Sequence, residues 1–111
     1  MSISTHVLDT ARGRPAAGLA VTLSRREPGG EWSVVGRAAT DADGRVRELS
    51  SVALKVGEYR LEFATGAYFK TSQTKGFYPE VSVVIVVADG ETHVHVPLLL
   101  SPFGYSTYKG T

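Results

Sequence analysis

The sequence contains no cysteine among its 111 residues, which excludes a disulfide framework, a thiolate metal site and a cysteine nucleophile. An excess of charge of one sign is also missing. Twelve lysines and arginines stand against 11 aspartates and glutamates, and the formal net charge is +1. This balance creates no field that would attract nucleic acid or an anionic membrane surface. We therefore expect a small molecule or another protein as the partner.

Long apolar runs are absent as well. Residues 1–20 lack the apolar stretch of a signal peptide, and no segment reaches the length needed to span a bilayer. No stretch rich in Gly, Ser or Pro is long enough to link two domains, and the length is close to that of a common single domain. These features predict one domain over residues 1–111, located in the cytoplasm.

The sequence does contain many short runs of strand-forming residues, separated by turns that carry Gly, Pro or Asp. This pattern is typical of an all-β fold. A short helix fits only residues 66–75, and the apolar strand from Val81 to Val87 is expected to be covered on both faces. Eight strands in this length predict a sandwich of two four-stranded sheets. The expected strands lie near residues 3–8, 19–26, 31–39, 45–49, 58–65, 81–88, 92–100 and 104–109.

Side-chain alternation places all three histidines outside the predicted core. In strand 3–8 it directs His6 away from the core, and in strand 92–100 it does the same for His93 and His95. The outward face also carries leucines, so it is too apolar for a free surface and predicts a contact between subunits. The core residues predicted in these two strands are Ile3, Thr5, Val7, Val94, Val96, Leu98 and Leu100.

Three side chains are the first candidates for catalysis. The imidazoles of His6 and His95 can take and return a proton near neutral pH, and from two strands of one sheet face they could flank a substrate. Arg45 follows the Asp43-Gly44 turn, where its planar guanidinium could hold an oxygen-rich ring and stabilise an oxyanion. Which of the two histidines removes the proton is left open by the sequence.

A zinc site is the competing chemical interpretation. His93 and His95 lie two residues apart on one strand face, and His6 could complete a shell of three histidines with an open position for water. Two histidines separated by one residue are a weak signal for a metal. Without zinc, His93 is either a partner of the catalytic histidines or a residue of the subunit contact.

Taken together, several motifs closely resemble the transthyretin-like 5-hydroxyisourate hydrolases. The resemblance runs over nearly the whole chain, and the two ends are its most specific parts. Thyroid-hormone transthyretins look similar around residues 7–9, but they carry lysine where this chain has His6 and lack the same ending. The motifs are STHVLDT at 4–10, GRPA at 13–16, DGR at 43–45, YPE at 78–80 and HVPLLLSPFGYSTY at 95–108.

The resemblance implies a homotetramer whose central channel holds sites built across subunit interfaces, with no metal and no cofactor. It implies that water activated by histidine, with stabilisation by arginine, hydrolyses 5-hydroxyisourate to 2-oxo-4-hydroxy-4-carboxy-5-ureidoimidazoline in urate degradation. His6, Arg45 and His95 would be catalytic. Tyr108 and Thr111 would close the pocket on the substrate.

The end of the chain departs from the family pattern. The usual Tyr-Arg-Gly-Ser is here Tyr108-Lys109-Gly110-Thr111, and lysine lacks the planar donor fork of arginine. If the basic side chain binds the substrate, the lysine changes the affinity for the substrate. If instead the tail backbone shapes the pocket, the lysine changes little. We favour this second interpretation. Two other classes stay open, a non-enzymatic small-ligand carrier on the same tetramer and a monomeric structural sandwich module.

Overall fold

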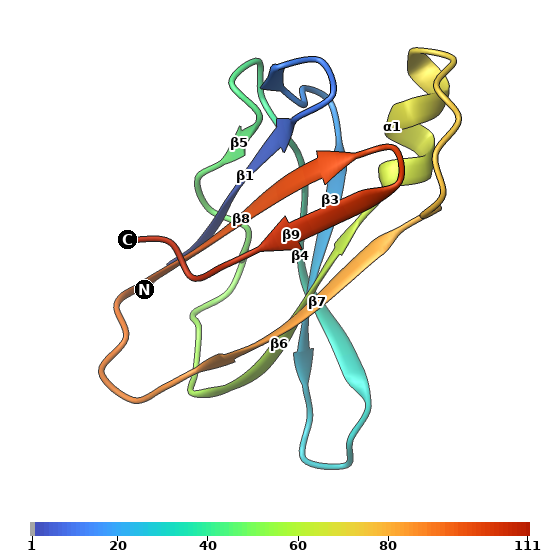
Figure 1. Cartoon of the computed structure of the whole chain (residues 1–111). Helices are drawn as coiled ribbons and strands as arrows, with labels where there is room; N and C mark the ends of the chain where they lie inside the picture. The colour runs from blue at the N-terminus through green and yellow to red at the C-terminus, as the bar shows by residue number, and fades with distance from the viewer. Residues whose placement is uncertain (1) are drawn as a thin grey trace.

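Two β-sheets packed against each other make up the computed structural model, which describes residues 2–111 (Figure 1). The first sheet has the order β2-β1-β8-β9, with β5 also paired to β1, and the second has the order β4-β3-β6-β7. The first sheet consists of β1 (Ser2–Asp9), β2 (Arg14–Pro15), β5 (Arg45–Val46), β8 (His93–Ser101) and β9 (Gly104–Thr107). The second consists of β3 (Ala20–Arg26), β4 (Trp32–Ala39), β6 (Gly57–Phe63) and β7 (Val81–Val87).

The predicted sandwich with one short helix, α1 (Thr65–Thr71), is confirmed. Some element bounds differ from the expectation; α1 and β9 end earlier than expected, at Thr71 and Thr107. The two-residue strand β2 makes the first sheet five-stranded, because residues 14–15 pair with the end of β1. Strand β5 stops at Val46, since the chain then leaves the ladder and returns only where the Leu49 N–H donates to the Ile3 carbonyl at 2.9 Å.

The parallel pair β1 and β8 forms the centre of the first sheet. In its register Ser2 lies opposite His93, and Ser4 lies opposite His95. Strand β9 then pairs antiparallel with β8 on the other side. The two ends of the sequence are therefore brought together on one sheet, as the blue and red strands of Figure 1 show.

The core lies between the two sheets and confirms the predicted alternation. The core set expected in β1 and β8 is buried, with exposed fractions of 4% or less. From the second sheet, Leu23, Tyr59, Leu61 and Phe63 contribute fully buried side chains. Burial of these residues on one face of each sheet fixes the register and turns the alternate residues of β1 and β8 outward.

The expectation that the strand from Val81 to Val87 is covered on both faces is wrong for the single chain. Val84 is 55% exposed and Val86 is 66% exposed. The reason is that Val84 and Val86 alternate with the residues of β7 that face the core, so they point outward, where they border an open hollow instead of being buried.

Within residues 2–111, no helix combines the length and the apolar character needed to cross a bilayer. The single helix in this range, α1, has seven residues.

Candidate active site

The outer face of the first sheet carries all three histidines. Because side chains opposite one another in a ladder point to the same side, the pairing of Ser4 with His95 puts β1 and β8 side chains on one face. His6 is two residues from Ser4 and shares that face, and His6 lies opposite Arg45 of β5. The candidates His6, Arg45 and His95 therefore share one sheet face, as predicted.

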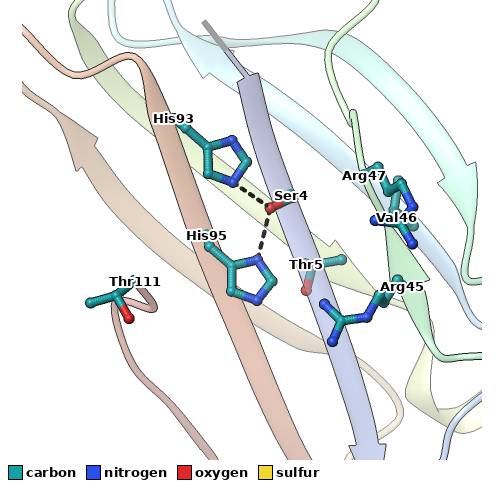
Figure 2. A pocket seen from close by; sticks show the side chains of 8 residues that line it. All are labelled: Ser4, Thr5, Arg45, Val46, Arg47, His93, His95 and Thr111. Atoms are coloured by element: carbon teal, nitrogen blue, oxygen red, sulfur yellow. Dashed lines mark hydrogen bonds between the residues drawn. The ribbon is translucent and has the colours of Figure 1, made fainter.

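Ser4 joins His93 and His95 through its hydroxyl. The Ser4 Oγ lies 2.7 Å from Nδ1 of His95 and 3.1 Å from Nε2 of His93. The two imidazole rings are stacked, with centroids 6.4 Å apart and planes inclined by 13°. Figure 2 shows Ser4 on the neighbouring strand with a hydrogen bond to each ring. The serine thus fixes the ring orientation of His95.

A tight turn places Arg45. The Asp41 carboxylate accepts hydrogen bonds from the backbone N–H of Asp43 at 2.8 Å and of Arg45 at 2.9 Å. These two bonds lower the pKa of Asp41 below its ordinary value. Gly44 has a φ of 76°, and a Cβ there would lie 2.4 Å from the carbonyl oxygen of Val7. The turn therefore needs glycine at this position and delivers the arginine to the edge of β1.

His6 is held by the same turn. Its Nε2 lies 2.9 Å from the Asp43 carbonyl oxygen. A carbonyl only accepts hydrogen bonds, so Nε2 carries the proton and donates it. The other ring nitrogen, Nδ1, is then left with a free lone pair. This arrangement suits a group that accepts a proton.

An open pocket of about 220 Å³ lies over this part of the sheet. Its volume is below that of ordinary small-molecule sites, roughly 300–1,000 Å³. In the view of Figure 2, Arg45 and Thr111 lie on opposite sides of His95. The pocket is lined by Ser4, Thr5, Arg45, Val46, Arg47, His93, His95 and Thr111. His6 is outside this lining but next to Arg45 in the ladder.

The surroundings of His95 favour its neutral form. Partial burial lowers its pKa below the ordinary histidine value, and the positive charge of Arg45 and the neighbouring imidazoles of His93 and His6 act in the same direction. At neutral pH the ring is therefore uncharged. A neutral imidazole can accept a proton, as a general base must.

The tail after β9 crosses His95. The Gly110 N–H donates to the His95 carbonyl oxygen at 2.8 Å, and Thr111 lines the pocket. The Lys109 ammonium donates instead to Glu91 at 2.7 Å. Tyr108, which the resemblance placed in the same pocket as Thr111, is 59% exposed and borders a second hollow, lined by parts of β7, β8 and the tail, to which His95 also contributes.

The structure thus brings Arg45, His95 and Thr111 around one pocket, with His6 beside them, while Tyr108 lines a second hollow that shares His95. Sequence reasoning missed the role of Ser4. The available signal was its position on the same strand face as His6.

Within residues 2–111 no three His, Asp or Glu side chains are grouped so that they could hold a metal ion, and the three histidines are no exception.

Comparisons with known proteins agree with the fold. Residues 3–110 match the model of the HIUase/Transthyretin family. A protein of Caulobacter vibrioides named 5-hydroxyisourate hydrolase is 46% identical, over 98% of this chain and 97% of its own length.

Two solved structures are also similar. The Klebsiella pneumoniae 5-hydroxyisourate hydrolase superposes with a TM-score of 0.88 at 34% identity, over 100% of both chains. Sea bream transthyretin in complex with thyroxine superposes with a TM-score of 0.93 at 30% identity, over 100% of this chain and 96% of that one. The backbone is therefore shared by a hydrolase and a hormone-binding protein, and the side chains must distinguish them.

Proposed function

The chain belongs to the HIUase/Transthyretin family, and we propose that it hydrolyses 5-hydroxyisourate to 2-oxo-4-hydroxy-4-carboxy-5-ureidoimidazoline. Its curated relatives at 41–46% identity carry the name of this hydrolase. They make the chain a hydrolase. The observation that carries the proposed mechanism is the convergence of His6, Arg45 and His95 on one outer sheet face beside a pocket.

In this mechanism a water bound in the pocket attacks the C6 carbonyl of the substrate. His95 is the better candidate for the base, because its pKa is lowered and its Nδ1 is fixed by Ser4. The opposite nitrogen, Nε2, makes no hydrogen bond within residues 2–111, so it is available to the water. His6 has a free Nδ1, which can accept the hydroxyl proton of the tetrahedral intermediate and pass it to the leaving nitrogen.

Arg45 supplies the positive charge. As the carbonyl becomes tetrahedral, negative charge develops on its oxygen, and a guanidinium fixed beforehand stabilises that charge without reorganising. The Asp41 turn orients the backbone from which Arg45 projects. The ring of the substrate is already reactive, so positioning and proton transfer are enough, and no covalent nucleophile is needed.

Assembly into a homotetramer completes the site in this proposal. The pocket of one chain is small and open, while an apolar surface lies exposed beside it. Apolar patches of this kind mark contacts between proteins. The exposed side chains that would be covered include Val84, Val86, Tyr105 and Tyr108. In this arrangement Thr111, and Tyr108 from across the interface, would close the pocket over the substrate.

The test of this function generates 5-hydroxyisourate with urate oxidase and follows the decay of its ultraviolet absorbance. We expect the protein to accelerate the decay, with or without a chelator. Unaccelerated decay contradicts the enzyme assignment. Activity lost on chelation favours the zinc-dependent alternative with the three histidines. Sedimentation at the mass of one chain contradicts the tetramer.

A small-ligand carrier is the second candidate, because transthyretin bound to thyroxine shares the backbone. A carrier needs the channel but neither histidine, so replacing His6 and His95 together would leave its ligand affinity intact. Loss of catalysis in the same double variant distinguishes the enzyme from the carrier.

A further inference from the structure

We propose that Ser4 and His93 are positioning residues that form, with Ser2, a hydrogen-bonded chain carrying a proton from His95 to solvent after each ring opening. The inference rests on the proposed function, because it needs His95 to take a proton from water. It assigns a role to His93 and to two serines that the catalytic set of His6, Arg45 and His95 does not contain.

The chain consists of three consecutive contacts. His95 Nδ1 lies 2.7 Å from Ser4 Oγ, and Ser4 Oγ lies 3.1 Å from His93 Nε2. His93 Nδ1 in turn contacts the hydroxyl of Ser2. The parallel register explains the regularity, because it sets Ser2 opposite His93 and Ser4 opposite His95 on the same face. Each histidine of β8 therefore meets a serine of β1.

The contacts run from the half-buried ring of His95 through the buried hydroxyl of Ser4 to the exposed ring of His93. Ser4 is buried, with 6% of its surface exposed. His95 and Ser2 are half-buried, and His93 is exposed. The contacts therefore lead from a group under the substrate to a group that reaches water. This is the order that a path for proton export requires.

The chemistry of the hydroxyl makes the chain directional. Ser4 has one proton to donate, so it donates to one imidazole and accepts from the other. When His95 Nδ1–H donates to Ser4, Ser4 donates to His93 Nε2, and the His93 Nδ1–H donates to Ser2. In this state His95 Nε2 has a free lone pair for the attacking water. When each donor passes its proton to its acceptor, all three hydrogen bonds reverse direction and one proton leaves from Ser2 to solvent.

Hydrolysis leaves one proton to be removed. The attacking water gives its first proton to His95 Nε2 while its oxygen bonds to the carbonyl carbon. The remaining hydroxyl proton goes to the ring nitrogen, which keeps the electron pair of the broken C–N bond. The products are a carboxylate and a neutral ureido group, and one proton stays on His95. Transfer of the Nδ1 proton through Ser4 and His93 makes the imidazole neutral, with its remaining proton on Nε2. After the product leaves, water takes the Nε2 proton while a proton returns along the chain to Nδ1, and this restores the starting tautomer for the next turnover.

A direct role of His93 is the main competing explanation, because His93 also lines the pocket. A histidine that binds the substrate would change KM when it is replaced. A relay acts after the substrate is bound, so its loss lowers kcat and leaves KM nearly unchanged. The two explanations therefore differ in a measurable way.

The experiment compares steady-state kinetics of the whole protein with those of Ser4→Ala and His93→Gln. We expect kcat to fall about 10- to 100-fold, less than the loss of up to about 10,000-fold expected for a residue that transfers the proton directly. KM should stay within about twofold. Added imidazole buffer should restore kcat of His93→Gln, because a small buffer can replace a lost proton carrier. If the substitution lowered kcat only by displacing a neighbouring side chain, added buffer would not restore kcat.

Ser82→Ala is the matched control, because Ser82 is an exposed serine of β7 in the other sheet. It should behave as the intact protein. Unchanged kcat in Ser4→Ala and His93→Gln, a raised KM with preserved kcat, or the absence of buffer rescue would overturn the relay. None of these results touches the proposed function, which fails only if the intact protein does not accelerate substrate decay.

A second measurement does not depend on activity. In the protein labelled with nitrogen-15 at histidine, the ring nitrogens report which of them carries the proton. We expect Ser4→Ala to change the shifts of His95 Nδ1 and His93 Nε2 together, because both lose the same partner. Shifts identical to those of the intact protein would contradict the hydrogen-bonded chain even if no substrate were available.

Discussion

The backbone N–H of Gly110 donates a hydrogen bond to the carbonyl oxygen of His95 at 2.8 Å. This bond holds the C-terminal tail across the strand that carries a candidate catalytic imidazole. It also brings Thr111 to the edge of the pocket. This backbone bond fixes where the tail lies, whereas the expectation that the tail backbone and not the Lys109 side chain shapes the pocket stays a prediction.

Replacing Gly110 by alanine is expected to displace the ring of His95. A Cβ at this position would lie 2.6 Å from His95 Cδ2 and 3.3 Å from Pro97 Cγ. We expect kcat to fall at least about tenfold, since a shift of about 1 Å in a reacting group can cost about 100-fold. The matched control is Gly104→Ala, whose Cβ would meet only Ser101 Oγ at 3.7 Å. Equal activity of the two variants would contradict this prediction.

Lys109→Met is expected to have little effect on catalysis. The Lys109 ammonium is bonded to Glu91, and its side chain is 67% exposed. An exposed ion pair contributes at most about 1 kcal/mol, so we expect the change in kcat/KM to stay below about fivefold. Steady-state kinetics of Lys109→Met and of Glu91→Gln check this. A KM that rises much further in Lys109→Met alone would show that the lysine grips the substrate.

The acid limb of the pH profile is expected below the ordinary histidine pKa of about 6.5. Burial, the charge of Arg45 and the imidazoles of His93 and His6 lower the pKa of His95, and Arg47 also faces the pocket. A base works only when it is unprotonated, so the pH at which kcat/KM falls to half of its plateau should lie below 6.5. A limb above 6.5 would argue against His95 as the base.

The effect of Arg45 on the pKa of His95 can be checked without an activity measurement. In Arg45→Gln one positive charge near His95 is gone, so the pKa of His95 should move up toward its ordinary value. Titration of the His95 ring by NMR measures this shift. Arg37→Gln on β4, in the other sheet, serves as the control and should leave the titration unchanged.

Tyr68→Phe tests a buried polar contact away from the site. The Tyr68 hydroxyl donates to Asp9 Oδ2 at 2.8 Å, and Asp9 is 2% exposed. Removing this donor leaves a buried carboxylate oxygen unsatisfied, which should reduce the free energy of unfolding by about 1–3 kcal/mol. Urea unfolding at fixed protein concentration measures the loss. Ser82→Ala, at an exposed serine of β7, should change it by less than about 0.5 kcal/mol.

The sequence predicted the sandwich well because alternation in its strands is regular. Residues such as Val94 and Leu98 alternate with His93 and His95, and burial of one face fixes the direction of all of them. The outward position of the histidines could be predicted for the same reason. The sequence could not reveal strand β2, because its two residues pair with β1 only in the folded chain.

The site was predicted less completely. The contact of Ser4 with His95 depends on the register between two strands that lie about 90 residues apart, and a serine in a strand carries no signal of its own. The resemblance implied that Tyr108 and Thr111 close one pocket, and the strand expected over residues 104–109 ran past Tyr108. The strand β9 ends at Thr107, and the chain then bends so that Gly110 pairs with His95.

The most direct test of the account measures kcat/KM for 5-hydroxyisourate in His95→Ala and Arg45→Ala, beside the intact protein and the control Arg37→Ala. We predict losses of about 100-fold or more in each site variant, the size expected when a proton-transfer group or an oxyanion-stabilising charge is removed. The control should keep the intact value. Site variants that open the ring as fast as the intact protein would contradict the account, because the pocket over β1 and β8 would then not be where the reaction occurs.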